Sequence, residues 1–174
     1  LSFTPLLSHS SQAVKQLQPT GDWNRFLRDR VEGRIGLTGG IEASGWKLVY
    51  RDTPSAYQKA AMKGRGANFT YSLGFAVDAS GKVGDVRWDS PAFNAGIGPG
   101  MQIVAINGLQ YSGSELEDAV RAAKDSKEAI NLLVKDVDTY RTLPITYTDG
   151  LRYPHLERIE GSTDYLTPIF TARE

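Results

Sequence analysis

The chain has 174 residues, of which 40% are hydrophobic, enough for one domain of typical size and a further segment. Its 20 basic and 20 acidic residues cancel, so no overall field directs it to nucleic acid or acidic lipid. Cysteine is absent, which excludes disulfide bonds and thiolate metal sites, and no apolar run approaches the ~20 residues of a membrane-spanning helix.

The first 40 residues carry the signals of two helices. Ser10 or Ser11 is placed to cap a helix that ends before Pro19, and Asp22 to cap a second. Apolar residues of the second helix recur at helical spacing and form a stripe, at Trp23, Phe26, Leu27 and Val31. Two short helices bury little surface on their own. We therefore expect this stripe to pack against a neighbouring domain.

The next segment is predicted to connect these helices to the main domain. Residues 33–45 are rich in glycine, which is typical of a linker. Residues 46–50 alternate apolar and polar and predict a strand, and Ser55 is placed to cap a short helix ending near Met62. The basic turn at 63–66 lacks the Lys-Ser/Thr pair of a phosphate-binding loop, which argues against phosphate binding there.

From residue 75 onward, strands alternate with two helices. The predicted strands cover residues 75–78, 82–88, 101–106, 129–135 and 140–147, the last two joined by a hairpin turn. Pro91 opens a short helix, and Ser112 or Ser114 caps a longer one. Its apolar residues share one face, at Leu116, Ala119, Val120 and Ala123. The pattern predicts an α+β domain, a partly open barrel or sandwich of six strands capped by two helices.

Catalytic and metal-binding patterns are scarce in this sequence. The two histidines, His9 and His155, lie near opposite ends, and His155 has only Glu157 close by, whereas a zinc site needs three protein ligands. A serine triad also requires a histidine beside its nucleophile. Residues 136–138 lack the glycine and distal glutamate of a calcium loop. We expect no metal or cofactor in this chain, and a surface or hydrogen-bonded role for His155.

Two stretches carry a more specific pattern. Residues 71–75 are Tyr-Ser-Leu-Gly-Phe and lead into a strand. Residues 90–108 hold a Ser-Pro-Ala helix, a Gly-Pro-Gly turn, an apolar strand and an Asn-Gly turn. Over residues 69–148 this order resembles the PDZ domain. Ser72 replaces the first glycine of that family's loop, and Met101 stands where an acidic residue commonly follows Pro-Gly. The resemblance implies a module that binds the C-termini of peptides or proteins.

The loop at residues 73–75 is the predicted binding site for a terminal carboxylate. A tight turn centred on a glycine lets consecutive backbone N–H groups point to one side and form an anion-binding nest. The donors would be the amides of Leu73, Gly74 and Phe75. An unpaired edge of the strand that follows would then accept the peptide as an additional strand.

The same resemblance implies a pocket for the ligand's last side chain. It would be lined by Leu73, Phe75, Val77, Leu116 and Val120. Leu116 stands where many members have a histidine, which implies an apolar residue two positions before the ligand's end. These side chains also suit the interior of any small barrel, so a filled groove remains the alternative.

A wider resemblance covers most of the chain. Residues 22–31, 45–54 and 150–161 are similar to the C-terminal third of bacterial glycyl-aminopeptidase-type zinc metallopeptidases. In that family a catalytic domain with a His-Glu-x-x-His motif precedes a PDZ domain. The motif is missing here, so no zinc ligand and no catalytic glutamate is carried over. The resemblance implies a zinc aminopeptidase parent of which this chain is a piece without activity.

Together these patterns predict that the chain has four parts. They are the last helices of a catalytic domain at 1–40, a connector at 41–68, a PDZ domain at 69–148 and a tail at 149–174 that packs back on it.

The predicted function is a peptide-binding or regulatory module whose partners are peptide C-termini and its own catalytic domain. The alternatives are a structural or oligomerisation domain, its groove filled by residues 46–50, by the tail past Thr148 or by a neighbouring subunit, and an enzyme with an unrecognised site. The resemblance favours a periplasmic or secreted location over a cytoplasmic one.

Overall fold

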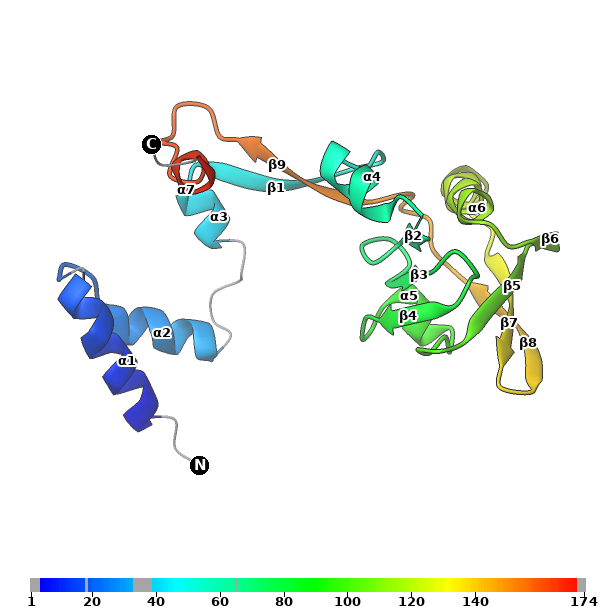
Figure 1. Ribbon diagram of the computed structural model, residues 1–174, viewed down its shortest axis with the longest axis horizontal. Helices are drawn as coiled ribbons and strands as arrows, with labels where there is room; N and C mark the ends of the chain where they lie inside the picture. Colours follow the sequence, from blue (N-terminus) through cyan, green and yellow to red (C-terminus); the bar gives the residue numbers. More distant parts are fainter. Residues whose placement is uncertain (1–3, 18, 33–38, 65, 172–174) are drawn as a thin grey trace. The chain divides into compact units, whose positions relative to one another are not determined.

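The computed structural model describes residues 4–17, 19–32, 39–64 and 66–171 (Figure 1). Within these ranges the helices are α1 (Thr4–Leu17), α2 (Trp23–Val31), α3 (Gly39–Ala43), α4 (Ala56–Met62), α5 (Pro91–Asn94), α6 (Gly113–Ser126) and α7 (Thr167–Phe170). The strands are β1 (Trp46–Arg51), β2 (Ala67–Asn68), β3 (Phe75–Val77), β4 (Val83–Val86), β5 (Gln102–Ile106), β6 (Leu109–Gln110), β7 (Ile130–Asp136), β8 (Thr139–Ile145) and β9 (Tyr153–Arg158). No described helix is both long and apolar enough to cross a membrane.

The strands form three sheets. β1 pairs with β9, β3 lies between β2 and β4, and the largest sheet has the order β6-β5-β7-β8. The second and third sheets are antiparallel throughout. The sheets do not close into a barrel, and the predicted α+β class is confirmed.

Contacts along the chain divide it into two units, one made of Val49–His155 and the other of the segments before and after. The buried apolar core belongs to Val49–His155 and runs from Ala67 to Tyr153. Its largest fully buried side chains include Phe69, Phe75 and Ile145. This unit therefore holds the candidate site.

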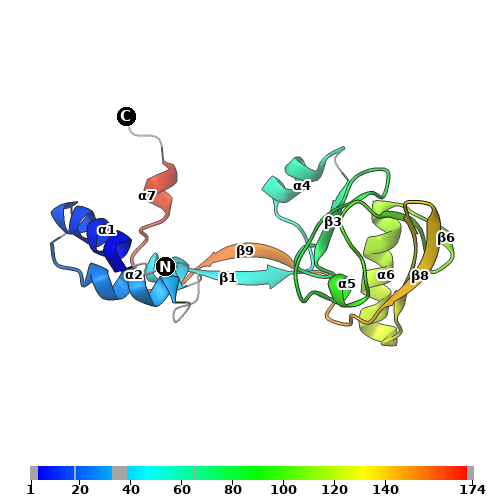
Figure 2. The same cartoon turned by 90° about the horizontal axis from the view of Figure 1, so that it is seen from below.

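Helix α6, labelled in Figure 2, covers the core. It contacts β5 and β7. Its cap is Ser112, whose Oγ accepts the Glu115 backbone N–H at 3.0 Å. The predicted apolar face is buried at all four positions, Leu116, Ala119, Val120 and Ala123. Local capping and helical spacing therefore determined both where α6 begins and which face it buries.

The short helices α4 and α5 also begin at the predicted residues. Ser55 and Gln58 form a capping box, in which each side chain bonds the other's backbone N–H. Ser90 Oγ accepts the Phe93 N–H at 3.2 Å, and Pro91 follows in the first turn of α5. The predicted hairpin is present as β7 and β8, which pair from Ile130↔Ile145 to Asp136↔Thr139.

In the other unit, α1 and α2 pack together. The predicted start of α1 at Ser10 or Ser11 is wrong, because the helix begins at Thr4 and both serines lie inside it. Proline is tolerated at position 5, in the first turn, because a backbone N–H there would have no helical carbonyl to bond. In α2 the Asp22 cap is present, while Phe26 and Val31 stay 41% and 59% exposed.

A polar cluster ties β1 to the chain after β9 in the same unit. Trp46 Nε1 donates to Asp164 at 3.0 Å, and the Arg158 guanidinium lies 5.4 Å from the Trp46 ring centroid. Arg158 also donates to the Gly45 carbonyl at 2.6 Å. Hydrogen bonds from the Thr167 amide, then from Trp46 and the Leu166 amide, hold the pKa of Asp164 below its usual range. The predicted linker at 33–45 lies partly outside the described residues, and its described end forms α3.

Candidate functional site

The loop predicted to bind a carboxylate lies deep in the unit rather than on its surface. Leu73 and Phe75 are fully buried, and Gly74 between them has a φ of +100°, which a side chain rarely adopts. A Cβ at Gly74 would stand 2.1 Å from the Ser90 Cβ. The glycine is therefore required by its backbone conformation and by the close approach of α5.

Backbone groups of this loop are bonded within the chain. The Gly74 N–H donates to the Phe69 carbonyl at 2.9 Å. The Leu73 carbonyl accepts the Ala92 N–H at 2.9 Å, and the Gly74 carbonyl accepts the Arg87 N–H at 2.7 Å. At least the middle amide of the proposed nest thus already has an acceptor, and the carboxylate-binding role of Leu73, Gly74 and Phe75 stays a prediction.

The edge of β3 expected to receive a peptide is occupied by β2. β3 bonds β4 on one side, and on the other it pairs Ala67↔Val77 and Asn68↔Ala76. The Phe69 N–H continues this ladder to the Phe75 carbonyl at 2.8 Å. Neither 46–50 nor the tail past Thr148 takes this position. The segment that does comes immediately before the loop.

β2 also lies against the helix side of the groove. A Cβ at Gly113, the first residue of α6, would be 3.3 Å from the Ala67 Cβ. On the opposite side, a Cβ at Gly66 would be 2.0 Å from the Val77 carbonyl oxygen, so only glycine permits this approach. β2 therefore runs between β3 and the start of α6, where a ligand strand was predicted.

The residues predicted to line the side-chain pocket are brought together by the fold. Val77 from β3 and Leu116 and Val120 from α6 belong to one buried cluster with Phe69. Leu116 and Val120 are fully buried and Val77 is 4% exposed. They contribute to the hydrophobic core, and their contact with a ligand stays a prediction.

Sequence reasoning missed the segment that fills the groove. Ala67, Asn68 and Phe69 alternate buried, exposed and buried, which is the pattern of a half-buried strand. Three residues are too short to stand out as a strand by periodicity alone. The signal that would have identified them is their position directly before a glycine turn into β3, as in a hairpin.

The chain after β8 packs against the outer side of the loop. Tyr147, Leu151 and Tyr153 are buried in the core, and the Arg152 N–H donates to Ser72 Oγ at 3.0 Å. Burial, reinforced by the Glu117 carboxylate, raises the pKa of Tyr153 to about 12. The hydroxyl of Ser72, the residue that replaces a glycine of the resembled family, thus anchors the segment after β8.

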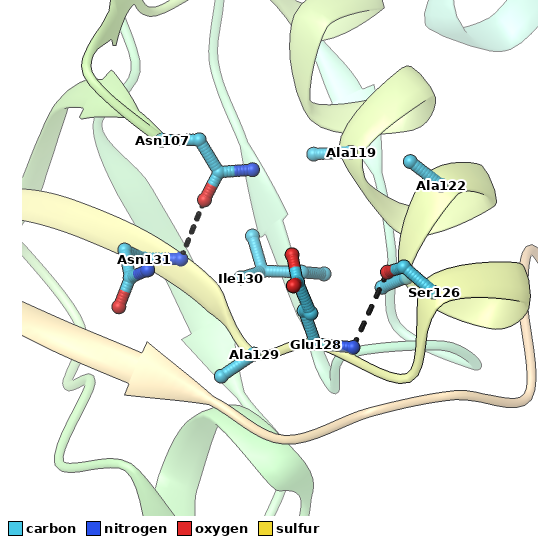
Figure 3. A pocket seen from close by; sticks show the side chains of 9 residues that line it. Asn107, Ala119, Ala122, Ser126, Glu128, Ala129, Ile130 and Asn131 are labelled. Carbon is cyan, nitrogen blue, oxygen red and sulfur yellow. Dashed lines mark hydrogen bonds between the residues drawn. The ribbon is translucent and has the colours of Figure 1, made fainter.

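A separate hollow of about 380 Å³ lies between the C-terminal end of α6 and the start of β7 (Figure 3). Its helix side is lined by alanines, at Ala119, Ala122 and Ala123. Asn107 Oδ1 accepts the Asn131 N–H at 2.9 Å, and Ser126 Oγ accepts the Glu128 N–H at 3.2 Å. None of its lining residues holds a buried side-chain polar atom without a hydrogen-bond partner, so we assign no ligand to it.

The described residues contain no group of three side chains that could hold a metal ion. His155 Nε2 lies 2.7 Å from the Thr53 carbonyl oxygen, a hydrogen bond within the chain. The described residues therefore offer no set of ligands for the zinc that is expected in a parent enzyme.

Comparison with known proteins gives a likeness of fold. No protein-family model and no curated protein matches the sequence. An aminopeptidase N family protein from Idiomarina loihiensis matches with a TM-score of 0.51 and 18% identity over 82% of this chain. This chain covers 25% of that protein. The HtrA3 PDZ domain, solved with a phage-derived ligand, has a TM-score of 0.34 and 18% identity, over 65% of this chain and 91% of that domain.

Proposed function

We propose that this chain is a C-terminal, non-catalytic part of an aminopeptidase-type protein, in which the unit Val49–His155 is a PDZ-like structural module. The observation that carries the proposal is the position of β2, which pairs with the edge of β3 that a peptide would need. The Gly74 amide, bonded to the Phe69 carbonyl, supports it further. The groove is then filled by the chain itself.

Opening this groove would cost a large part of the binding free energy of an ordinary peptide ligand, which is about 8 kcal/mol at micromolar Kd. Phe69 is 1% exposed, and removing a buried Phe side chain from a core costs about 3–5 kcal/mol. A peptide that had to displace Phe69 would lose roughly 10²–10⁴-fold in affinity. A ligand of ordinary micromolar strength would then bind at about millimolar Kd, so the filled groove acts as structure.

The experiment titrates the whole chain with short peptides that have a free or an amidated C-terminus, and follows backbone amide shifts by NMR. We expect no ligand-dependent shift at Leu73, Gly74 or Phe75. The companion variant is Gly66→Ala, which places a Cβ against the Val77 carbonyl and weakens β2 pairing. Its matched control is Gly64→Ala, also at positive φ but with open space around the new Cβ. Saturable shifts at the loop of the unmodified chain would contradict the proposal.

A second candidate function is peptide-end recognition that begins when β2 leaves the groove. It is favoured by the length of β2, two residues, and by the left-handed turn at Gly74 directly before β3. Leu73, Gly74 and Phe75 would then hold the carboxylate, with Val77, Leu116 and Val120 around the last side chain. The result that selects this candidate is binding gained by Gly66→Ala, removed by amidation and absent in Gly64→Ala.

An aminopeptidase activity of the parent protein is part of this proposal. It rests on the resemblance of residues 22–31, 45–54 and 150–161 and on the likeness of fold. The zinc and the catalytic glutamate would come from the preceding domain, and the exposed Phe26 and Val31 of α2 offer it an apolar surface. We expect the purified chain to cleave no peptide substrate with or without added zinc. Zinc-dependent cleavage by this chain alone would contradict the assignment.

A further inference from the structure

Two aromatic side chains stand together on the surface at the short helix α5. The centroids of the Trp88 and Phe93 rings are 4.4 Å apart, and the two residues are 78% and 37% exposed. A tryptophan as exposed as Trp88 offers a broad ring face to solvent, and tryptophan is enriched among the residues that contribute most to protein interfaces. The aromatic pair is therefore a contact surface in search of a partner.

A polar pair lies beside the aromatic pair. Asn94 Nδ2 donates to Asp89 Oδ1 at 3.4 Å. Because residues 88 and 89 are neighbours in sequence, as are residues 93 and 94, the two pairs bridge the same two points of the chain. The bond leaves Asp89 Oδ2 and Asn94 Oδ1 without a hydrogen-bond donor among the described residues. The polar pair thus presents two acceptor oxygens and a negative charge.

The polar pair also forms part of a hollow between α5 and the end of β8. Its volume of about 340 Å³ is within the roughly 300–1,000 Å³ typical of ligand sites. The other lining residues are small or apolar, apart from one hydroxyl, and are Pro91, Ala95, Pro144 and Thr146. The Asp89 carboxylate is the one charged group in this lining, so the hollow favours a cationic ligand.

The described part of the chain supplies no cation to either pair. Asp89 is in none of its ion pairs. No described cation lies over the Trp88 ring, since the cation–π contacts of these residues are at Phe26, Tyr50 and Trp46. The face of an indole ring is electronegative and attracts a cation, as the neighbouring carboxylate does. The two attractions act at one place.

We propose that this surface binds an arginine side chain of a partner protein. The guanidinium lies on the Trp88 ring and donates to Asp89 Oδ2 and Asn94 Oδ1 at the hollow. A planar guanidinium can stack on a ring and fork to two acceptors at once, whereas the compact ammonium of lysine can do neither. The site uses no residue of β2 or of the loop at 73–75, so it does not depend on the filled groove.

The test measures binding of the whole chain to a heptapeptide in which one arginine is flanked by serine and glycine. The peptide is acetylated and amidated, so it carries no terminal charge. Binding is followed by NMR at the Trp88 indole N–H and the Asn94 side-chain amide. We expect replacement of the arginine by citrulline, a neutral analogue of the same shape, to weaken binding about tenfold or more, because the charged hydrogen bonds are lost. The lysine peptide should also bind more weakly than the arginine peptide.

Two pairs of variants locate the site. Asp89→Asn removes the charge at a φ of +55°, which asparagine tolerates, and should weaken binding about tenfold. Its control is Asp138→Asn, an exposed aspartate in the turn between β7 and β8. Trp88→Ala should weaken binding about two- to fivefold, the range of an exposed cation–π contact. Its control is Tyr140→Ala, at a 60% exposed position of β8 outside the hollow. Far-UV circular dichroism checks that each variant is folded.

Three results would overturn the proposal. One is an arginine peptide that does not bind, or that binds no better than its citrulline analogue. Another is a lysine peptide that binds as well as the arginine peptide, which would remove the role of the planar guanidinium. The third is binding that both Asp89→Asn and Trp88→Ala leave unchanged, which would place the peptide elsewhere. None of these results bears on the filled groove, which is tested by its own titration.

Discussion

Among single residues, Gly74 joins the loop, β3 and α5, and a substitution there is expected to be costly. Gly74→Ala puts a Cβ 2.1 Å from Ser90 and forces a side-chain-bearing residue to a φ of +100°. Left-handed backbone alone costs about 1–2 kcal/mol, so with the clash we expect a loss of roughly 3 kcal/mol or more in unfolding free energy. Urea denaturation measures it. Gly108→Ala, at a φ of +88° in open space, should lose only the backbone part, and an equal loss at both positions would refute the role of the close approach.

Tyr153 is expected to make the stability of Val49–His155 sensitive to alkaline pH. Burial, then the Glu117 charge, raises the pKa of its phenol to about 12, against about 10 for the exposed group in the unfolded chain. The neutral phenol is therefore favoured by folding. This contribution is present below pH 10 and is lost as pH rises towards 12, by up to about 3 kcal/mol.

The measurement compares urea midpoints at pH 9 and pH 11.5. Tyr153→Phe should lose less stability over this interval than the unmodified chain. Some dependence should persist, because burial and the Asp78 charge also raise the pKa of Tyr111 to about 12. Tyr165→Phe, at a 62% exposed position, is the control. If the Tyr153→Phe variant keeps the same pH dependence, then ionisation of the Tyr153 phenol is not coupled to unfolding.

At the scale of elements, local signals in the sequence were sufficient for α6 and for the β7–β8 hairpin. Ser112 supplies a capping oxygen, and four apolar residues at helical spacing determine the buried face of α6. The hairpin follows from two apolar segments joined by a short turn. In each case the signals that determine the element are local in the sequence: a cap and helical spacing for α6, and a short turn between adjacent strands for the hairpin.

β2 and β9 were not predictable in the same way, because distant pairing stabilises them. β2 has two residues and depends on β3 and on the tolerance of Gly66 for close approach. β9 was expected only as an apolar tail, and it forms a strand by pairing with β1. The predicted residues of the groove were correctly grouped in space, while what fills the groove depended on β2.

At the scale of the whole chain, the distribution of buried residues predicts how each end affects folding. All of the described buried apolar side chains lie between Ala67 and Tyr153, and α2 contributes none of them. Deletion of residues 1–38 is therefore expected to leave the urea midpoint of the core unchanged, when followed by near-UV circular dichroism of its aromatic residues.

Deletion at the other end should have the opposite effect, although it removes fewer residues. A chain that stops before Tyr147 loses three buried side chains, Tyr147, Leu151 and Tyr153, and the bond from Arg152 to Ser72. Truncating one large buried side chain costs about 2–5 kcal/mol, so the loss of all three approaches the whole stability of an ordinary domain. We expect this shorter chain to be unfolded or molten. A fully cooperative transition at the original midpoint would mean that the segment after β8 only rests on the domain, and the anchoring role of Ser72 would have to be abandoned.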